Sequence, residues 1–344
     1  MRPTLSWPDI PGRTVGILGL GREGEANLRA CRARGIEPVL VDDNPWNRSE
    51  RVLPTAVGED FDYWVIEVSS YQAVDMPVSP PVVAVTSLHP DHLPWHCNDP
   101  NLYYRDKLSL AAQPGADLTV ANGDSALIRG RRALLGPRVR WVCATDDPNA
   151  TWLTPLHLLG THNRRNALIA RAVMQALGVP EADDPEALAT AAVGFGGLES
   201  RLQIIGEVSG VTFVDDNLST NVLSTLAAVE AFPDRRVALI VGGQERGIDY
   251  RALGEGLRSR HTPILVLTIP GNGTRIRAML ETANPGPAVT AVDTPDLNAA
   301  VRVGYEWARP DGIVLLSPAA ASFGHFRNYK ERGAVFATAM AACR

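Results

Sequence analysis

The chain has 344 residues, of which 45% are hydrophobic, which is enough for two or three domains with apolar cores. Its net charge of -5 and pI near 5.8 give no basic surface for nucleic acid. No apolar run is long enough to span a membrane, and the N-terminus lacks a signal-peptide pattern. The four cysteines show no Cys-x-x-Cys spacing. We therefore expect a cytoplasmic protein.

The first predicted elements form a strand, glycine-rich turn, helix and strand. The strands are residues 14–18 and 39–41, and the helix is residues 25–34. The turn at residues 19–24 has the Gly-x-Gly-x-x-Gly pattern, and Asp42 follows the second strand. Such a turn lets the backbone and the helix N-terminus approach a pyrophosphate. The pattern predicts a nucleotide diphosphate site, usually for NAD; the alternative is a βαβ unit with a merely tight turn.

Two short apolar runs, residues 63–66 and 82–86, are predicted as buried strands of a parallel sheet. Glu67 follows the first run and His92 comes shortly after the second, so we expect them at neighbouring strand ends, where open α/β sheets bind ligands. A carboxylate and an imidazole there suit a divalent cation such as Mg²⁺. The alternative is a hydrogen-bonded surface glutamate and a helix-capping pair of Asp91 and His92.

Three motifs in this region carry a resemblance to a known family. They are Glu-Val-Ser-Ser-Tyr-Gln from Glu67, Pro-Asp-His-Leu-x-x-His from Pro90, and Tyr-x-x-x-Lys ending at Lys107. In this order they resemble the central domain of the Mur ligases, and most of all the MurD type, which adds glutamate to UDP-N-acetylmuramoyl-L-alanine. The resemblance implies that Glu67 and His92 bind Mg²⁺ in the catalytic centre. It also implies that Lys107 is carbamylated and becomes a third, anionic ligand.

The resemblance also assigns a role to the glycine-rich turn. In MurD-type ligases the matching loop and acidic strand end hold the UDP of the substrate. Leu20, Gly21, Arg22 and Asp42 would inherit that role here.

The chain departs from the family where a P-loop is expected. Lys107 and Lys330 are its only lysines and neither follows a glycine, so no Gly-Lys-[Ser/Thr] occurs. Residues 44–62 form a connector without a convincing strand and helix. Either the sequence omits a block of the native protein, or the chain is a paralogue that has lost the ATP site.

From residue 108 to residue 197 strands and helices alternate. The clearest predicted elements are residues 117–122, 159–177 and 183–192. The second of these, a helix, opens in a Gly-x-His-Asn-x-x-Asn-Ala box that resembles the one the Mur ligases have there. The resemblance implies that His162, Asn163 and Asn166 bind ATP near its adenine and ribose; alternatively, Asn163 only caps the helix.

Beyond residue 198 the apolar runs indicate a second α/β unit. Its predicted strands and helices are residues 211–214, 222–231, 237–243, 264–267, 297–307 and 313–316. The Ser-Arg-Leu-Gln run at Arg201 resembles a family boundary motif whose arginine lies near the ATP phosphates. The family aspartate matching Asp216 contacts the nucleotide, whereas Leu218 stands where most relatives carry a lysine.

Two boxes of this unit resemble the glutamate site of the family. A Gly-Gly-x-x-Arg-Gly-x-Asp box places Arg246 where relatives have a lysine that meets a carboxylate of glutamate, and arginine can do so bidentately. The Ser-Pro-Ala-x-Ala-Ser box and the helix after it place Ser322, Phe323 and Tyr329 at the amino acid, and Thr220 would join them. Without the family, the second box is a strand end capped by Ser322 before an amphipathic helix.

The expected fold is α/β, with the multi-domain architecture of the Mur ligases, parallel-sheet domains and a Rossmann-like C-terminal domain. We expect an incomplete UDP-binding domain at residues 1–50, an ATPase-like domain without its P-loop at 51–197 and a glutamate-binding domain at 198–344.

The implied function is ATP- and Mg²⁺-dependent addition of glutamate to UDP-N-acetylmuramoyl-L-alanine through an acyl phosphate, in peptidoglycan precursor synthesis, by a monomer. The motif at residues 87–96 looks closer to the subgroup that uses L-glutamate than to the D-glutamate enzymes. The alternatives are a UDP-sugar-binding paralogue without an ATP site, and an NAD-dependent dehydrogenase, which only the glycine-rich turn and Asp42 support.

Overall fold

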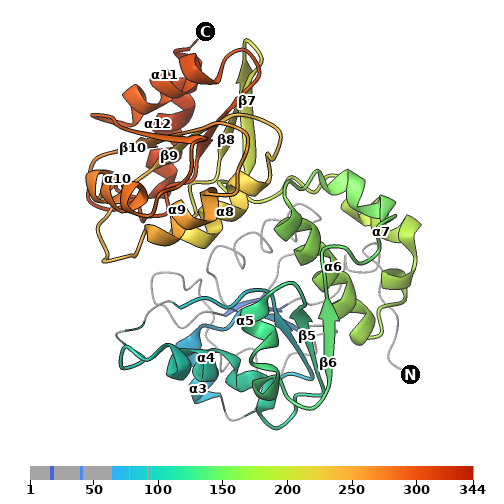
Figure 1. Ribbon diagram of the computed structural model, residues 1–344. Coiled ribbons are helices and arrows are strands. Elements are labelled where there is room, and N and C mark those ends of the chain that lie inside the picture. The colour runs from blue at the N-terminus through green and yellow to red at the C-terminus, as the bar shows by residue number, and fades with distance from the viewer. Residues whose placement is uncertain are drawn as a thin grey trace. The chain divides into compact units, whose positions relative to one another are not determined.

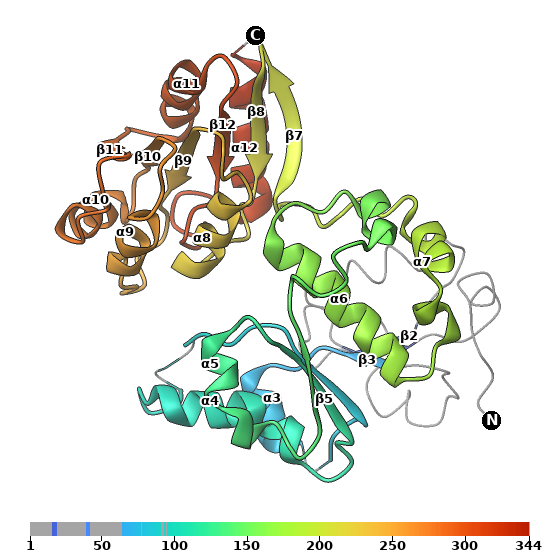
Figure 2. The same cartoon turned by 45° about the vertical axis from the view of Figure 1, so that its right-hand side comes forward.

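The computed structural model describes residues 16–18, 39–41, 64–76, 78–90, 93 and 95–343. The chain divides into two compact units (Figures 1 and 2). The first is Met1–Leu156 with Arg164–Phe195, and the second is His157–Asn163 with Gly196–Arg344. Both contain parallel strands flanked by helices, so the α/β class predicted from the sequence is confirmed.

The described residues of the first unit form two three-stranded parallel sheets. One has the order β2-β1-β3 and is formed by β1 (Gly16–Leu18), β2 (Val39–Val41) and β3 (Trp64–Ile66). The other has the order β4-β5-β6 and is formed by β4 (Val82–Val85), β5 (Leu118–Asn122) and β6 (Val139–Val142). β1 and β2 are the strands predicted around the glycine-rich turn, and the turn and its helix lie outside the described residues.

The strands before Glu67 and His92 do not pair with each other. β3 pairs with β1, and β4 pairs with β5 in the other sheet. The prediction that these two strand ends are neighbours is therefore wrong, because an apolar run indicates a strand but does not specify its partner. The prediction that these strands are buried holds only in part, since Val85 is buried, whereas Val65 is 68% exposed and Ala84 of the edge strand β4 is also exposed.

The central strand β5 carries the core of the first unit. Its side chains alternate between two apolar clusters, with Val120 in one and Ala121 in the other, as the two-residue period of a strand requires. Among the described residues, the helices of this unit are α3 (Ser70–Asp75), α4 (Pro100–Leu108), α5 (Ala126–Arg129), α7 (Pro185–Ala192) and α6 (Thr161–Ala176), of which residues 161–163 count to the second unit. Short 3₁₀ helices lie at Ser109–Ala112, Arg132–Leu134, Thr151–Leu156 and Pro180–Asp183. α4 and α5 contribute to the cluster of Ala121, and α6 and α7 contribute to the cluster of Val120.

The second unit is built on one six-stranded sheet with the order β11-β10-β9-β12-β8-β7. Its strands are β7 (Gln203–Val208), β8 (Val211–Asp215), β9 (Val237–Val241), β10 (Ile264–Thr268), β11 (Val289–Asp293) and β12 (Ile313–Leu316). All neighbours are parallel except β7 and β8, which form an antiparallel hairpin.

Helices cover both faces of this sheet. They are α8 (Val222–Glu230), α9 (Arg251–Leu257), α10 (Gly273–Thr282), α11 (Leu297–Ala308) and α12 (Tyr329–Ala341). α8, α9 and α10 share an apolar cluster with Leu239, and α11 and α12 share the opposite cluster with Ile240 (Figure 2). This doubly covered sheet matches the Rossmann-like unit predicted from the runs of apolar residues.

Two general expectations can be compared with the described residues. None of the helices among them is long and apolar enough to cross a membrane. Among the described cysteines, Cys97, Cys143 and Cys343 are not joined by disulfides.

Candidate functional site

The C-terminal ends of three adjacent inner strands form one edge of the six-stranded sheet, and the segments after them contain three predicted glutamate-binding residues. Strand β12 pairs in parallel with β9 on one side and β8 on the other, with Leu316 opposite Ile240 and Asp215. The segments that leave these strand ends carry Thr220, Arg246 and Ser322. Open α/β sheets bind ligands at this edge.

The loop after β9 presents Arg246 to solvent. The Arg246 Nε donates to the Gln244 side-chain oxygen at 3.2 Å, so the guanidinium has one internal contact and remains exposed. Gly243 has a φ of 152°, and a Cβ there would lie 2.3 Å from the main-chain oxygen of Ala321. Only glycine fits at this point, because the loop after β9 passes directly against the loop after β12.

The other predicted glutamate residues differ in exposure. Ser322 is buried, Thr220 is exposed and Tyr329 is half-buried at the start of α12. The Phe323 ring is 52% exposed although it is apolar, which suits a residue that covers a ligand. Their roles at the amino acid remain predictions.

A buried arginine that carried no assignment from the sequence ties the three strand ends together. Arg332 of α12 is 1% exposed and donates to the side chain of Asn217, which follows β8. It also donates to the main-chain oxygens of Gly242 at 3.3 Å and Ala320 at 3.2 Å, which follow β9 and β12. The signal in the sequence was the Arg-Gly pair at the end of the last box.

The aspartate predicted to contact the nucleotide has its oxygens engaged inside the protein. Asp216 is 5% exposed and accepts hydrogen bonds from Ser317 Oγ at 2.7 Å, Ser219 Oγ at 2.5 Å and the Leu202 amide at 3.2 Å. Burial raises the pKa of its carboxyl to about 6, against the opposing effect of these hydrogen bonds. These bonds fix the segment that contains the half-buried Arg201.

The neighbouring carboxyl of Asp215 also binds the segment around Arg201. It accepts from Ser200 Oγ at 2.9 Å and from the Asn217 amide at 2.9 Å. Burial raises the pKa of Asp215 as well. The end of β8 therefore carries two buried carboxyls that organise the segment around Arg201.

The predicted adenine box lies at the start of α6. Asn163 donates from Nδ2 to the main-chain oxygen of Leu159 at 2.9 Å. α6 begins at Thr161, so Asn163 lies inside the first turn and not at the N-cap position, and the capping alternative is wrong. His162 is half-buried and Asn166 is exposed. Contact of these residues with a nucleotide remains a prediction.

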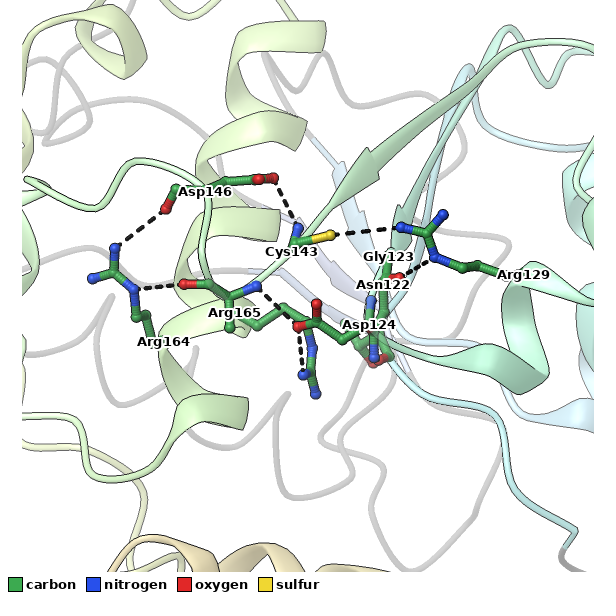
Figure 3. Close-up of polar contacts among 10 residues, drawn as sticks. Asn122, Gly123, Asp124, Arg129, Cys143, Asp146, Arg164 and Arg165 are labelled. Carbon is green, nitrogen blue, oxygen red and sulfur yellow. Dashed lines mark hydrogen bonds and ion pairs between the residues drawn. The ribbon is translucent and has the colours of Figure 1, made fainter.

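A polar network fastens α6 to the ends of β5 and β6 (Figure 3). Asp124 accepts from Arg165 at 3.1 Å and from the Ala144 amide at 2.9 Å, and hydrogen bonds and the positive charge of Arg165 lower the pKa of Asp124 despite some desolvation. Arg164 donates to the Ala144 carbonyl at 2.8 Å. The two arginines inside the Asn-x-x-Asn box therefore position the helix that carries Asn166.

The predicted metal residues of the first unit are described only in part. Glu67 is exposed directly after β3, and Lys107 is half-buried in the last turn of α4. His92 lies outside the described residues, as do the UDP-site residues Leu20, Gly21, Arg22 and Asp42. Within the described part no group of three or more potential ligands is found. The donor chemistry still fits, because an exposed carboxylate and a lysine carbamate both offer oxygen to a hard cation.

Comparisons with known proteins agree with the resemblance. The Mur ligase glutamate ligase domain matches residues 200–320. A UDP-N-acetylmuramoyl-L-alanine–L-glutamate ligase of Micromonospora is 42% identical over 356 residues, which cover 96% of this chain and 74% of the relative. The enzyme of the same name from Salinispora tropica is 38% identical over 357 residues, covering 98% of this chain and 76% of the relative.

Solved structures share the fold at low sequence identity. The MurF ligase of Thermotoga maritima in complex with ADP has a TM-score of 0.56 and 12% identity, covering 96% of this chain and 95% of that one. The UDP-N-acetylmuramate–alanine ligase MurC of the same organism has a TM-score of 0.53 and 14% identity, covering 96% and 86%.

Proposed function

The chain belongs to the Mur ligase family, and on that premise we propose that it joins L-glutamate to UDP-N-acetylmuramoyl-L-alanine at the expense of ATP. The observation that carries the proposal is the sheet edge at which Thr220, Arg246 and Ser322 follow three adjacent parallel strands. The three strand ends, with Thr220 and Arg246, lie within residues 200–320, which match the glutamate ligase domain, and Ser322 follows two residues later. The names of the two relatives favour the L-isomer over D-glutamate.

Recognition of glutamate follows from the charges at this edge. The exposed guanidinium of Arg246 holds the side-chain carboxylate through two hydrogen bonds, and the hydroxyls of Thr220 and Ser322 bind the other carboxylate. Phe323 and Tyr329 flank the carbon chain. An amino acid with a single carboxylate would leave the arginine without its partner.

The reaction consists of two group transfers. The γ-phosphoryl group of ATP passes to the substrate carboxylate, which releases ADP and forms an acyl phosphate. The glutamate amine then attacks the acyl carbon, the phosphate leaves and an amide bond forms as the amine loses its proton. The protein contributes mainly positioning and stabilisation of charge.

Several residues of this chain would hold the substrates. His162, Asn163 and Asn166 are assigned to the base and ribose of ATP, and Arg201 and Asp216 to the phosphate end. Because Asp216 has its oxygens engaged by internal donors, we assign it an indirect role through the segment of Arg201. Leu20, Gly21, Arg22 and Asp42 would bind the UDP.

Mg²⁺ is proposed at Glu67, His92 and a carbamylated Lys107. When bound, the ion neutralises charge on the transferring phosphoryl group. Glu67 would supply a carboxylate directly after β3. Lys107, in the last turn of α4, would supply a carbamate oxygen once its amine has reacted with CO₂. The nucleotide substrates place this step of peptidoglycan precursor synthesis in the cytoplasm.

One observation favours a second candidate function. The sequence contains no Gly-Lys-[Ser/Thr], so the usual contacts to the ATP phosphates are not encoded in it. A paralogue that binds the UDP-sugar without ligating it would have this sequence property.

An endpoint assay separates the two candidates. The purified chain is incubated with UDP-N-acetylmuramoyl-L-alanine, ATP, Mg²⁺ and either L- or D-glutamate, and the products are identified by mass spectrometry. We expect the L-glutamyl product with equimolar ADP. Calorimetric binding of the UDP-sugar without any product would instead support the paralogue, and tighter binding of NAD than of the UDP-sugar would contradict both.

A further inference from the structure

A buried histidine links two helices of the first unit that adjoin the predicted metal residues. The His96 side chain is 0% exposed, and its Nδ1 lies 2.7 Å from Asp106 Oδ2 of α4. Its Nε2 lies 3.3 Å from Ser70 Oγ of α3. The sequence motif contained this histidine, but neither the residues nor the resemblance gave it a role.

The order Ser70, His96, Asp106 is that of a hydrolytic triad, yet burial argues against nucleophilic chemistry. Ser70 is 3% exposed, so its hydroxyl does not face a substrate. A catalytic serine has to present its oxygen to the scissile group. The three side chains therefore form a structural relay between α3 and α4.

The ring of His96 is also fixed from its sides. Trp95 and Tyr103 lie edge-on to the imidazole, with centroid distances of 4.5 and 5.0 Å. Its main-chain oxygen accepts from the amide of Asp99, the N-cap residue of α4. Both the backbone and the imidazole of His96 thus contact α4 or its cap.

Each end of the relay lies next to a predicted ligand of Mg²⁺. Ser70 opens α3 three residues after Glu67, and Asp106 directly precedes Lys107 on α4. Successive residues of an α-helix point about 100° apart, so anchoring Asp106 fixes the direction in which Lys107 leaves the helix. A second bond, from Ser109 Oγ to the main-chain oxygen of Ala73 at 2.8 Å, holds the same two helices together.

We propose that His96 is a positioning residue for the Mg²⁺ site. Through its hydrogen bonds to Ser70 and Asp106, it fixes the segment of Glu67 relative to the helix of Lys107. His96 is not itself a ligand, because both of its ring nitrogens are engaged in hydrogen bonds. This inference rests on the proposed function, since that function requires the metal site. Mutation of residues that orient metal ligands without touching the ion typically lowers metal affinity by about 10- to 100-fold. We therefore expect an effect of roughly tenfold here.

The test measures metal binding independently of catalysis. Mn²⁺ is titrated into the full chain in bicarbonate buffer and the free ion is followed by electron paramagnetic resonance. His96→Gln and Asp106→Asn should each raise the Mn²⁺ dissociation constant roughly tenfold. The Mn²⁺ dissociation constant of the double variant should not exceed that of the weaker-binding single variant, because both changes break the same relay. Asp106→Asn keeps the size of the side chain and serves if His96→Gln does not fold.

A matched control separates positioning from loss of stability. Asp99→Ala removes the N-cap of α4, whose Oδ1 accepts from the Asn101 amide at 2.8 Å, and leaves the relay in place. It should lower the thermal midpoint without changing the Mn²⁺ dissociation constant. The proposal is overturned if the relay variants bind Mn²⁺ as the control does, or if the unmodified chain binds no Mn²⁺.

Ligation is then assayed on the same proteins. The relay variants should need about tenfold more Mg²⁺ for half-maximal rate, with the glutamate KM unchanged because the amino acid is assigned to the other unit. Weakened Mn²⁺ binding in the relay variants, together with no ligation by the unmodified chain, would reject the proposed function and leave the role of His96 supported.

Discussion

Arg332 donates from Nη2 to the main-chain oxygen of Asn217 at 3.0 Å, so the last helix holds the end of a strand 115 positions earlier. The same guanidinium reaches Gly242 and Ala320, and the three acceptors precede the segments that carry Thr220, Arg246 and Ser322. The geometry of the proposed glutamate site therefore depends on one buried side chain that does not need to touch the amino acid.

Arg332→Met should destabilise the second unit and weaken glutamate binding. Methionine has a similar length but leaves buried carbonyl groups without a donor, so we expect the free energy of unfolding to fall by about 3 kcal/mol. The glutamate KM should rise in protein that remains folded, because three loops lose a common anchor. Urea unfolding and initial rates measure the two effects.

The matched control for this change is Arg327→Met. Arg327 is an exposed arginine shortly before the same helix, and it pairs with Glu331 at 3.1 Å. Exposed ion pairs contribute little to stability, so the unfolding free energy of Arg327→Met should stay within about 0.5 kcal/mol of that of the unmodified protein. Equal unfolding curves for both variants would contradict the anchoring role of Arg332.

Arg246→Ala should raise the glutamate KM at least tens-fold. Loss of a charge-assisted bidentate pair with a carboxylate typically costs roughly 2–5 kcal/mol. Arg246→Lys should have a milder effect, since a lysine stands at this place in related ligases. The UDP-substrate KM should not change in either variant, and both are assayed with L- and D-glutamate.

Arg251→Ala provides the comparison for Arg246. It is also an exposed arginine after β9, and its guanidinium is paired with Asp249 at 2.5 Å, which lowers the pKa of Asp249 to about 2. Because this side chain is already paired, its removal should leave the glutamate KM unchanged. A KM that rises equally for both arginines would show a general effect of charge and contradict a specific contact.

The sequence predicted the second unit well because its strands are buried on both faces. Runs such as residues 237–241 and 264–267 are continuously apolar, and the structure buries every residue of β9 and β10. β7 and β11 were not predicted. They are the edge strands of the sheet, and exposed polar residues such as Glu207 and Thr290 interrupt the apolar pattern.

The candidate site was predictable only where a motif marked it. Arg246 and Ser322 lie in boxes with fixed spacing, whereas the roles of Arg332 and His96 depend on partners 115 and 26 positions away. Spacing along the chain contains no information on such contacts. The pairing of β3 with β1 was missed for the same reason, since two short apolar runs do not specify whether they pair with each other or belong to different sheets.

Asp216→Asn should change how stability depends on pH. Burial raises the pKa of Asp216 from 3.8 to about 6, so between these values the folded protein keeps a proton that the unfolded chain has released. Stability from this group is fully present below 3.8 and is lost as the pH rises through about 6. The variant lacks this titration, and between pH 4.5 and 8 it should gain on the order of 2 kcal/mol relative to the unmodified protein.

Urea unfolding at a series of pH values measures this difference. Asp215, whose pKa is also raised by burial, is present in both proteins, so the comparison isolates Asp216. Asp311→Asn changes an exposed carboxyl and should leave the profile as it is. Parallel profiles for Asp216→Asn and the unmodified protein would show that the Asp216 carboxyl does not titrate abnormally.

The last prediction concerns the carbamate on Lys107, which the chain allows to be observed directly because Lys330 is its only other lysine. Addition of CO₂ replaces a cation with an anion, and a divalent ion at the proposed Mg²⁺ site would stabilise that anion. In ¹³C-bicarbonate with Mg²⁺, the carbamate resonance should persist in Lys330→Ala and disappear in Lys107→Ala. Lys107→Ala should also abolish ligation; bicarbonate should not restore it, whereas a short-chain carboxylic acid should restore part of it by supplying the missing oxygen ligands. Full activity of Lys107→Ala, or a resonance that follows Lys330 instead, would remove Lys107 from the site.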